Sequence, residues 1–263
     1  MIKHVTVGTD GSRYAEGAAR YAVWLADAYQ TKLTGCYVMD RRVLEGPFFA
    51  RLSMLLGFTP ATDYREAVEP VLHSLGETAL GFIAELAREA GVEFTPRICE
   101  GPVASTLVER AAKSEVLVVG RQGDHAAYEN DLLGSVAEAV LRRAPAAVLL
   151  APADYLAPRR LALFYDQHTV DGETLRFTLA LPRELPLLVI HTPELADEAR
   201  RTIEEYGRPA EFEALAETPA ERVARLNDSD LTLFEADNER GHLVIDARVQ
   251  QAINNSRGPL LIA

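Results

Sequence analysis

The chain has 263 residues, of which 48% are hydrophobic and 25% charged, a composition typical of packed globular proteins and a length that fits two domains. The formal net charge is −12, with 15 basic and 19 acidic side chains in residues 1–152 and 12 and 20 in residues 153–263. Neither part has the basic surface that binding to nucleic acid requires, and no apolar run reaches the roughly 18 residues of a membrane span. The N-terminus enters a strand-like segment without the long apolar region of a signal peptide, so we expect a cytoplasmic protein.

The lysines and cysteines restrict the kinds of phosphate site and thiol chemistry that are possible. The three lysines, Lys3, Lys32 and Lys113, do not lie in a G-x-x-x-x-G-K-[ST] arrangement, which excludes a P-loop. A bound phosphate would therefore rest on backbone amides, hydroxyls, a metal ion or arginine. Cys36 and Cys99 lie in apolar strand-like stretches, where a disulfide or a metal pair would compete with two buried free thiols. We favour free thiols in a reducing compartment.

Residues 1–152 alternate between short apolar runs and helical patterns. This alternation predicts a doubly wound parallel sheet. The apolar segment 41–66 is expected to be an insertion with a short helix, which covers a site, meets another surface or packs on its own sheet. Gly91 is expected to cap the helix before it. Strands are expected at 5–9, 33–39, 92–99, 116–119 and 147–150, and helices at 13–29, 67–90, 103–113 and from about 135 to 144.

The pattern then starts again after a linker at 152–158. Residues 159–166 match residues 3–10 at a fixed offset, and 229–234 repeat 114–119. We therefore predict two domains, 1–152 and 159–263, each an α/β fold with a doubly wound five-stranded parallel sheet. The second series of elements is expected at 159–166, 172–181, 187–191, 193–206, 210–215, 218–226, 231–234, 243–255 and 259–262.

The glycine-containing stretch after residue 116 is the candidate site. Gly120 and Gly123 directly follow a buried strand, and Gly134-Ser135 opens the next helix. In α/β proteins such a turn binds phosphate, because backbone N–H groups converge there and the helix dipole favours an anion. The glycines are expected to permit positive φ and close approach to a ligand. Asp10 ends the first strand at the same edge of the sheet, where such folds bind their ligands.

These residues carry a resemblance. Gly120-x2-Gly123-x10-Gly134-Ser135, together with Val7-Gly8-Thr9-Asp10-Gly11-Ser12, resembles the fingerprint G-x2-G-x9-G-[ST] and V-x-x-D-G-S of the universal stress protein family in its tandem two-domain form, with one extra loop residue. The resemblance implies a Rossmann-like fold of the adenine-nucleotide alpha-hydrolase type. It also implies binding of ATP or another adenine nucleotide, with Mg or Mn on the phosphates. It further implies that the last strands of the two domains pair, and that the tandem chain can form a homodimer.

The resemblance also implies a role for each matched residue. Asp10 and Thr9 would contact the ribose or the phosphates, and the backbone of Val38 would contact adenine. Val119 and Gly120 would approach the adenosine, and Gly123 the phosphates. The phosphate oxygens would accept the N–H groups of Gly134, Ser135 and Val136 and the Ser135 hydroxyl. Apart from the resemblance, Arg121 in the glycine-containing loop is a candidate for an outer phosphate contact.

Structural roles compete with these assignments. Ser135 with Glu138 reads as a capping box, and Asp10 can cap the first helix or form an Asx turn. His125 is a candidate base, although loop histidines are more often solvated. In the second domain Glu235, Asn238, Asp246 and Ala247 stand where the first has Gly120, Gly123, Gly134 and Ser135. We expect that domain to have lost nucleotide binding.

Three functions are compatible with the sequence. The first is an ATP-binding stress protein with a regulatory, nucleotide-dependent role and no catalytic residue. The second is a slow metal-dependent ATPase or nucleotidyl-transfer enzyme. The absence of H-x-G-H and S-G-G-x-D-S signatures from the sequence argues against it. The third is a scaffold with an empty pocket.

Overall fold

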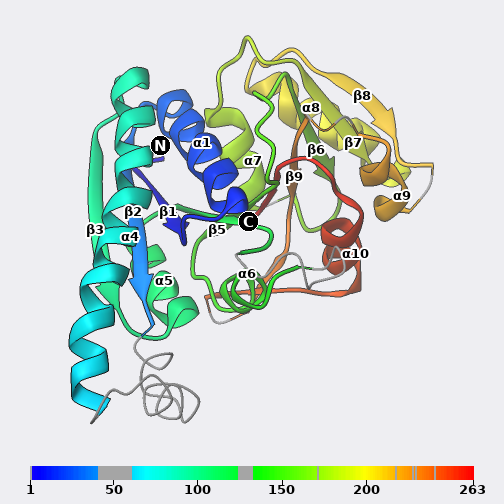
Figure 1. Cartoon of the computed structure of the whole chain (residues 1–263). Coiled ribbons are helices and arrows are strands. Elements are labelled where there is room, and N and C mark those ends of the chain that lie inside the picture. Colours follow the sequence, from blue (N-terminus) through cyan, green and yellow to red (C-terminus); the bar gives the residue numbers. More distant parts are fainter. Residues whose placement is uncertain are drawn as a thin grey trace.

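A computed structural model describes residues 2–263 except 41–60, 124–132, 171, 217, 227, 229 and 240, and only the backbone of 61–67. The predicted insertion at 41–66 and His125 thus lie largely or wholly outside the described residues. Ten strands form one sheet in the order β3-β2-β1-β4-β5-β12-β9-β6-β7-β8 (Figure 1). The strands of the sheet are β1 (His4–Thr9), β2 (Lys32–Met39), β3 (Phe94–Glu100), β4 (Val116–Gly120), β5 (Ala147–Ala151), β6 (Arg160–Tyr165), β7 (Leu187–His191), β8 (Glu211–Ala214), β9 (Asp230–Phe234) and β12 (Leu260–Ile262).

Each half of the sheet is parallel, and the halves join through one antiparallel pair. β5 pairs with β12, with Leu149 opposite Leu261. This confirms the expectation that the last strand of each half mediates the pairing. The first half has the order 3-2-1-4-5, and the second repeats it with β8, β7, β6, β9 and β12. β1 and β6 begin and end at positions related by the predicted offset.

Helices cover both faces of the sheet. α1, α4, α7 and α8 pack on one face, and α5, α6, α9 and α10 on the other, so each face has one core that runs through both halves. The helices are α1 (Arg13–Ala28), α4 (Ala61–Ala90), α5 (Val103–Ala111), α6 (Ser135–Leu141), α7 (Glu173–Ala180), the 3-10 turn η2 (Pro193–Leu195), α8 (Ala196–Glu205), α9 (Pro219–Ala224) and α10 (Ala247–Asn255).

Two tyrosines, one in α1 and one at its C-cap, fix the first half to the linker and to the second half. The Tyr29 hydroxyl donates to the Phe177 carbonyl at 3.2 Å, and the Tyr21 hydroxyl to the Leu156 carbonyl at 3.1 Å. Gly17 allows the linker to approach, because a Cβ there would overlap the Pro152 carbonyl oxygen. Gly91 has φ +71°, as expected for the residue that ends α4.

A hairpin in the second half was not predicted. Strands β10 (Asp237–Glu239) and β11 (His242–Val244) pair antiparallel and turn at Gly241, whose φ is +83°. They lie between β9 and α10, where the first half has its glycine-containing loop.

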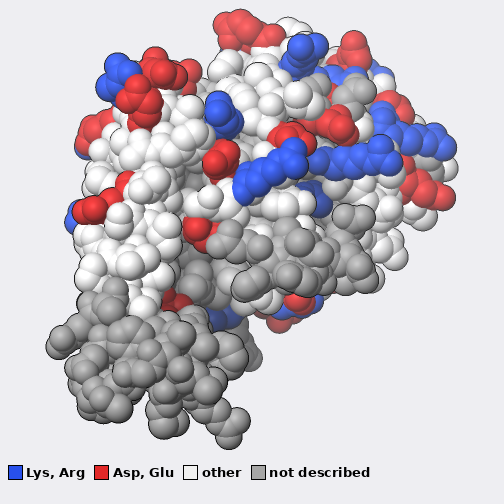
Figure 2. Space-filling view, in the orientation of Figure 1, with Lys and Arg blue, Asp and Glu red and all other residues white. Residues whose placement is uncertain are grey.

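On the face shown in Figure 2, basic side chains are interspersed with acidic ones.

Candidate functional site

A cavity of about 290 Å³ lies at the carboxyl ends of β1 and β4. Every predicted site residue except Arg121 lines it. The lining consists of Gly8, Thr9, Asp10, Ala15, Cys36, Val38, Val103, Leu107, Val119, Gly120, Gln122, Gly123, Gly134, Ser135, Val136 and Ala137. The strand order reverses between β1 and β4, which is where open α/β sheets place their ligand sites.

The turn after β1 holds the Asp10 carboxylate at the cavity. Oδ1 of Asp10 accepts the Ser12 N–H at 3.0 Å, and the Ser12 hydroxyl caps α1 by accepting the Ala15 N–H at 3.2 Å. Asp10 thus forms the Asx turn, while Ser12 rather than Asp10 caps the helix. A Cβ on Gly123 would lie 2.7 Å from the other Asp10 oxygen, so the residue at 123 has to be small for the carboxylate to keep this position.

The glycines are needed for close packing and not for unusual dihedrals. Gly120 and Gly123 do not have positive φ, so that part of the prediction is wrong. A Cβ on Gly120 would lie 2.8 Å from Tyr14 Cβ and 2.9 Å from the Tyr14 carbonyl carbon. Gly120 therefore lets the first turn of α1 approach the end of β4.

The N-terminus of α6 corrects two further expectations. Gly134 is the N-cap and Ser135 the first helical residue, without a side-chain capping bond, so Ser135 does not form the predicted capping box. The Gly134 N–H donates to the Arg121 carbonyl at 2.7 Å and is therefore not free for a phosphate. The N–H groups of Ser135 and Val136 lie in the first turn, where helices offer no internal acceptor. Both residues are exposed and line the cavity.

The lining of the cavity combines apolar and polar side chains. Val38, Val103, Leu107 and Val119 are the larger apolar residues of the lining, and Thr9, Asp10, Gln122 and Ser135 are its polar side chains. Among the described lining residues Asp10 is the one carboxylate. No group of three or more metal-ligating side chains occurs in the described part of the chain, so a metal here would need ligands from elsewhere.

Cys36 is a lining residue that the sequence analysis did not assign to the site. It lies two residues before Val38 on the same face of β2, which is the signal that could have identified it. Its Sγ lies 3.6 Å from Sγ of Cys99, and both are free cysteines, as predicted. Burial, followed by the nearby Cys99, raises the pKa of Cys36 to about 12, so the thiol is uncharged at neutral pH.

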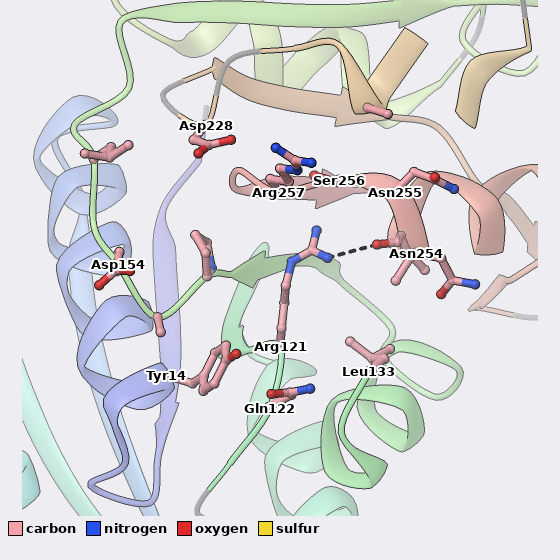
Figure 3. Close-up of a pocket in the computed structure, with 15 residues that line it drawn as sticks. Tyr14, Arg121, Gln122, Leu133, Asp154, Asp228, Asn254, Asn255, Ser256 and Arg257 are labelled. Atoms are coloured by element: carbon pink, nitrogen blue, oxygen red, sulfur yellow. Dashed lines mark hydrogen bonds between the residues drawn. The ribbon is translucent and has the colours of Figure 1, made fainter. Parts of the chain in front are cut away.

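Arg121 does not contribute to this cavity. Its Nη1 donates to the Ile253 carbonyl at the end of α10, 2.8 Å away, in a second cavity between the two halves (Figure 3). The prediction of an outer phosphate contact is therefore not supported. The side chain is directed by the docking of the second half, which the local sequence pattern does not encode.

The second half has a different arrangement at the equivalent place. Arg121 N–H donates to the Ala151 carbonyl and Ala236 N–H to the Ala263 carbonyl, which places Glu235 where the first half has Gly120. The Glu235 carboxylate accepts the Thr174 N–H at 2.8 Å and the Glu173 N–H at 3.2 Å, so it occupies the N-terminus of α7. Burial raises the pKa of Glu235, against the opposing effect of these hydrogen bonds.

Arg248 lies one residue after the counterpart of Ser135 and contacts the backbone of Glu235. Its Nη1 donates to Asp166, the counterpart of Asp10, at 2.7 Å, and its Nη2 to the Glu235 carbonyl at 2.9 Å. The guanidinium also lies over the Phe234 ring, 4.8 Å from the centroid. Asp246 caps α10 by accepting the Val249 N–H at 2.8 Å. The acidic groups that replace the glycines thus have partners within the chain.

Comparison with known proteins places this arrangement in a family. The model of the universal stress protein family matches residues 1–152, more than half of the chain. The chain belongs to the universal stress protein family. The expected resemblance is thereby confirmed, and the same strand order in the second half supports the tandem arrangement.

Some relatives match nearly the whole chain, and others match one part of it. Universal stress protein Slr1230 from Synechocystis is 22% identical over 99% of both chains. Universal stress protein MJ0531 from Methanocaldococcus jannaschii is 31% identical over 57% of this chain and 82% of its own. The crystal structure of a universal stress protein from Archaeoglobus fulgidus has a TM-score of 0.73 at 14% identity and covers 99% of this chain and 97% of its own, which shows the same fold. Within the described residues, no helix is long and apolar enough to cross a membrane.

Proposed function

We propose that this universal stress protein binds one adenine nucleotide, ATP in the first instance, in the cavity of its first half, and that binding serves a regulatory role. The observation that supports the proposal best is that the fingerprint residues meet at one cavity. Asp10, Val38, Gly123 and Ser135 come from four separate segments and all line it. A volume of about 290 Å³ is close to the lower limit of roughly 300 Å³ for small-molecule sites.

The polarity of the cavity suggests how the nucleotide lies. Adenine would contact apolar residues of the lining, among them Val38 and Val119, and the ribose would approach Thr9 and Asp10. The phosphates would accept the N–H groups of Ser135 and Val136 and the Ser135 hydroxyl. Because Asp10 is the one carboxylate among the described lining residues, Mg or Mn would take its other ligands from the phosphates and water.

We further propose that the second half does not bind nucleotide. A phosphate at the equivalent place would lie at the N-terminus of α10, where the Asp246 carboxylate already accepts the Val249 N–H at 2.8 Å. It would also have to separate Asp166 from Arg248, whose side chains are only 17% and 18% exposed. The expected stoichiometry is therefore one nucleotide per chain.

Two measurements on the full chain test this function. Mass spectrometry of protein purified without added nucleotide reports what is retained, and calorimetric titration with Mg-ATP reports affinity and stoichiometry. Gly123→Val is expected to reduce the affinity at least about tenfold, because the new side chain displaces Asp10 and enters the cavity. Gly81→Val is the matched control, since a Cβ there has nothing within 4 Å.

The outcomes separate the candidate functions. A regulatory binder binds Mg-ATP without turnover, whereas the alternative ATPase or nucleotidyl-transfer enzyme releases product at a rate that Gly123→Val abolishes. If the wild-type chain gives no heat with Mg-ATP and retains no nucleotide, the proposed function is wrong and the scaffold hypothesis stands.

A further inference from the structure

A second cavity, of about 520 Å³, lies at the junction of the two halves. Tyr14 and Arg121 line it from the first half, Asp154 from the linker, and Asp228, Ser256 and Arg257 from the second half. Figure 3 shows Arg121 extended into the middle of this space, with Arg257 across from it. Gln122 lines both this cavity and the one in the first half, so the two are neighbours.

Arg121 lacks partners for part of its guanidinium group. Nη1 donates to the Ile253 carbonyl, but the buried atoms Nε and Nη2 have no hydrogen-bond partner in the described part of the chain. Burial lowers the pKa of Arg121 to about 10, partly offset by the nearby Tyr14, and the group is still charged at neutral pH. Buried polar groups are almost always hydrogen-bonded, and a buried charge without a counter-ion is costly.

The free edge of the guanidinium indicates the kind of ligand. Nε–H and one Nη2–H point the same way and form the fork that binds two oxygens of a carboxylate or phosphate. The remaining charged groups do not compensate Arg121. Asp154 pairs with Arg13 at 2.5 Å and is therefore already neutralised. Of the other charged lining residues, Asp228 carries one negative charge, and Arg121 and Arg257 carry one positive charge each, so the cavity has one positive charge in excess.

We infer that this junction cavity is a second ligand site, which binds a small carboxylate or phosphate compound through Nε and Nη2 of Arg121. Arg257 adds a second positive charge to the cavity. Apolar lining residues such as Leu133 and Leu156 would contact the organic part of a small ligand. Because the site uses residues of both halves, a ligand here stabilises their contact. The site does not depend on nucleotide binding in the first half.

The test uses the full chain, with inorganic phosphate and succinate as probes in separate titrations at constant ionic strength, and sodium chloride as the reference. Calorimetry and the thermal midpoint are both recorded, since a ligand that binds the folded chain raises the midpoint. We expect one probe to bind the wild type and Gly123→Val equally. Arg121→Gln is expected to lose at least about tenfold in affinity, and Arg257→Gln less. The exposed Arg88→Gln, far from the cavity on α4, serves as the matched control. The probe that binds more tightly identifies the ligand class.

Three results would overturn the inference. The first is equal binding by the wild type and Arg121→Gln. The second is loss of phosphate binding in Gly123→Val with retention in Arg121→Gln, which would assign the phosphate to the cavity of the first half. The third is that neither probe binds while Arg121→Gln lowers the midpoint, which would mean that Arg121 only joins the halves through Ile253. If Arg121→Gln does not fold, Arg121→Lys replaces it, because lysine keeps the charge but cannot form the fork.

Discussion

The strength of the ion pair between Asp166 and Arg248 can be measured, and it tests the proposal that this pair occupies the place equivalent to the nucleotide site. Both side chains are largely withdrawn from water, and Nη1 lies 2.7 Å from Oδ2. A charge-assisted hydrogen bond in such a setting contributes about 1.5–3 kcal/mol. We therefore expect a coupling of about 2 kcal/mol between Asp166→Asn and Arg248→Met in the free energy of unfolding.

The design of this cycle isolates the pair. Arg248→Met also removes the bond to the Glu235 carbonyl and the contact with Phe234, but these losses occur in both arms and cancel. Asp166→Asn keeps the turn in which Oδ1 accepts the His168 N–H at 2.9 Å. Urea denaturation followed by circular dichroism gives the four free energies.

A matched pair on the surface provides the comparison. Glu85 and Arg88 are 59% and 69% exposed, so their coupling is expected to be too small to measure and to be screened by salt. A coupling for Asp166 and Arg248 below about 0.5 kcal/mol, within the additivity of independent sites, would refute the reasoning. Asp166 would then be free to accept another ligand.

Two further predictions concern stability. Gly17→Ala is expected to lower the free energy of unfolding by about 2 kcal/mol, because its Cβ overlaps the Pro152 carbonyl and lies 2.8 Å from that of Ala153. Gly81→Ala, with no neighbour within 4 Å, should be neutral or stabilising by up to about 1 kcal/mol. Denaturant titration checks both, and equal effects would contradict the packing argument. Because the pKa of Cys36 rises from 9.0 to about 12 on folding, the unfolded chain loses that proton first, and stability falls as pH rises above about 9. The loss is about 1.4 kcal/mol at pH 10 and should be absent in Cys36→Ala; an unchanged slope in that variant would assign the loss to other groups.

Most of the fold could be predicted from the hydrophobic periodicity of the sequence and from its internal repeat. Apolar runs followed by helical patterns predicted the ten strands of the large sheet but not the hairpin strands β10 and β11, and the matched positions of β1 and β6 revealed the second copy. Asp10 and Gly120 could be brought to one cavity because carboxyl ends of neighbouring parallel strands share an edge of the sheet.

The parts that failed depend on contacts between distant segments. Ser135 with Glu138 fits a capping box, but Gly134 takes the N-cap position and its N–H bonds to Arg121. Arg121 points to Ile253, which is 132 positions away, and Arg248 pairs with Asp166 across 82 positions. No local pattern specifies such partners, because the first contact follows from how the halves dock and the second from how distant segments of the second half pack together.

The junction of β5 with β12 determines where the protein can associate with other chains. Because these strands pair with each other, β3 and β8 are the outermost strands of the ten-stranded sheet within the described residues. Exposed Pro96 in β3 removes a backbone donor, and exposed Glu211 and Glu213 in β8 place like charges along the other border. Both features disfavour addition of a foreign strand. Copies of this chain that assemble are therefore expected to meet through helices and loops, and not by extending the sheet.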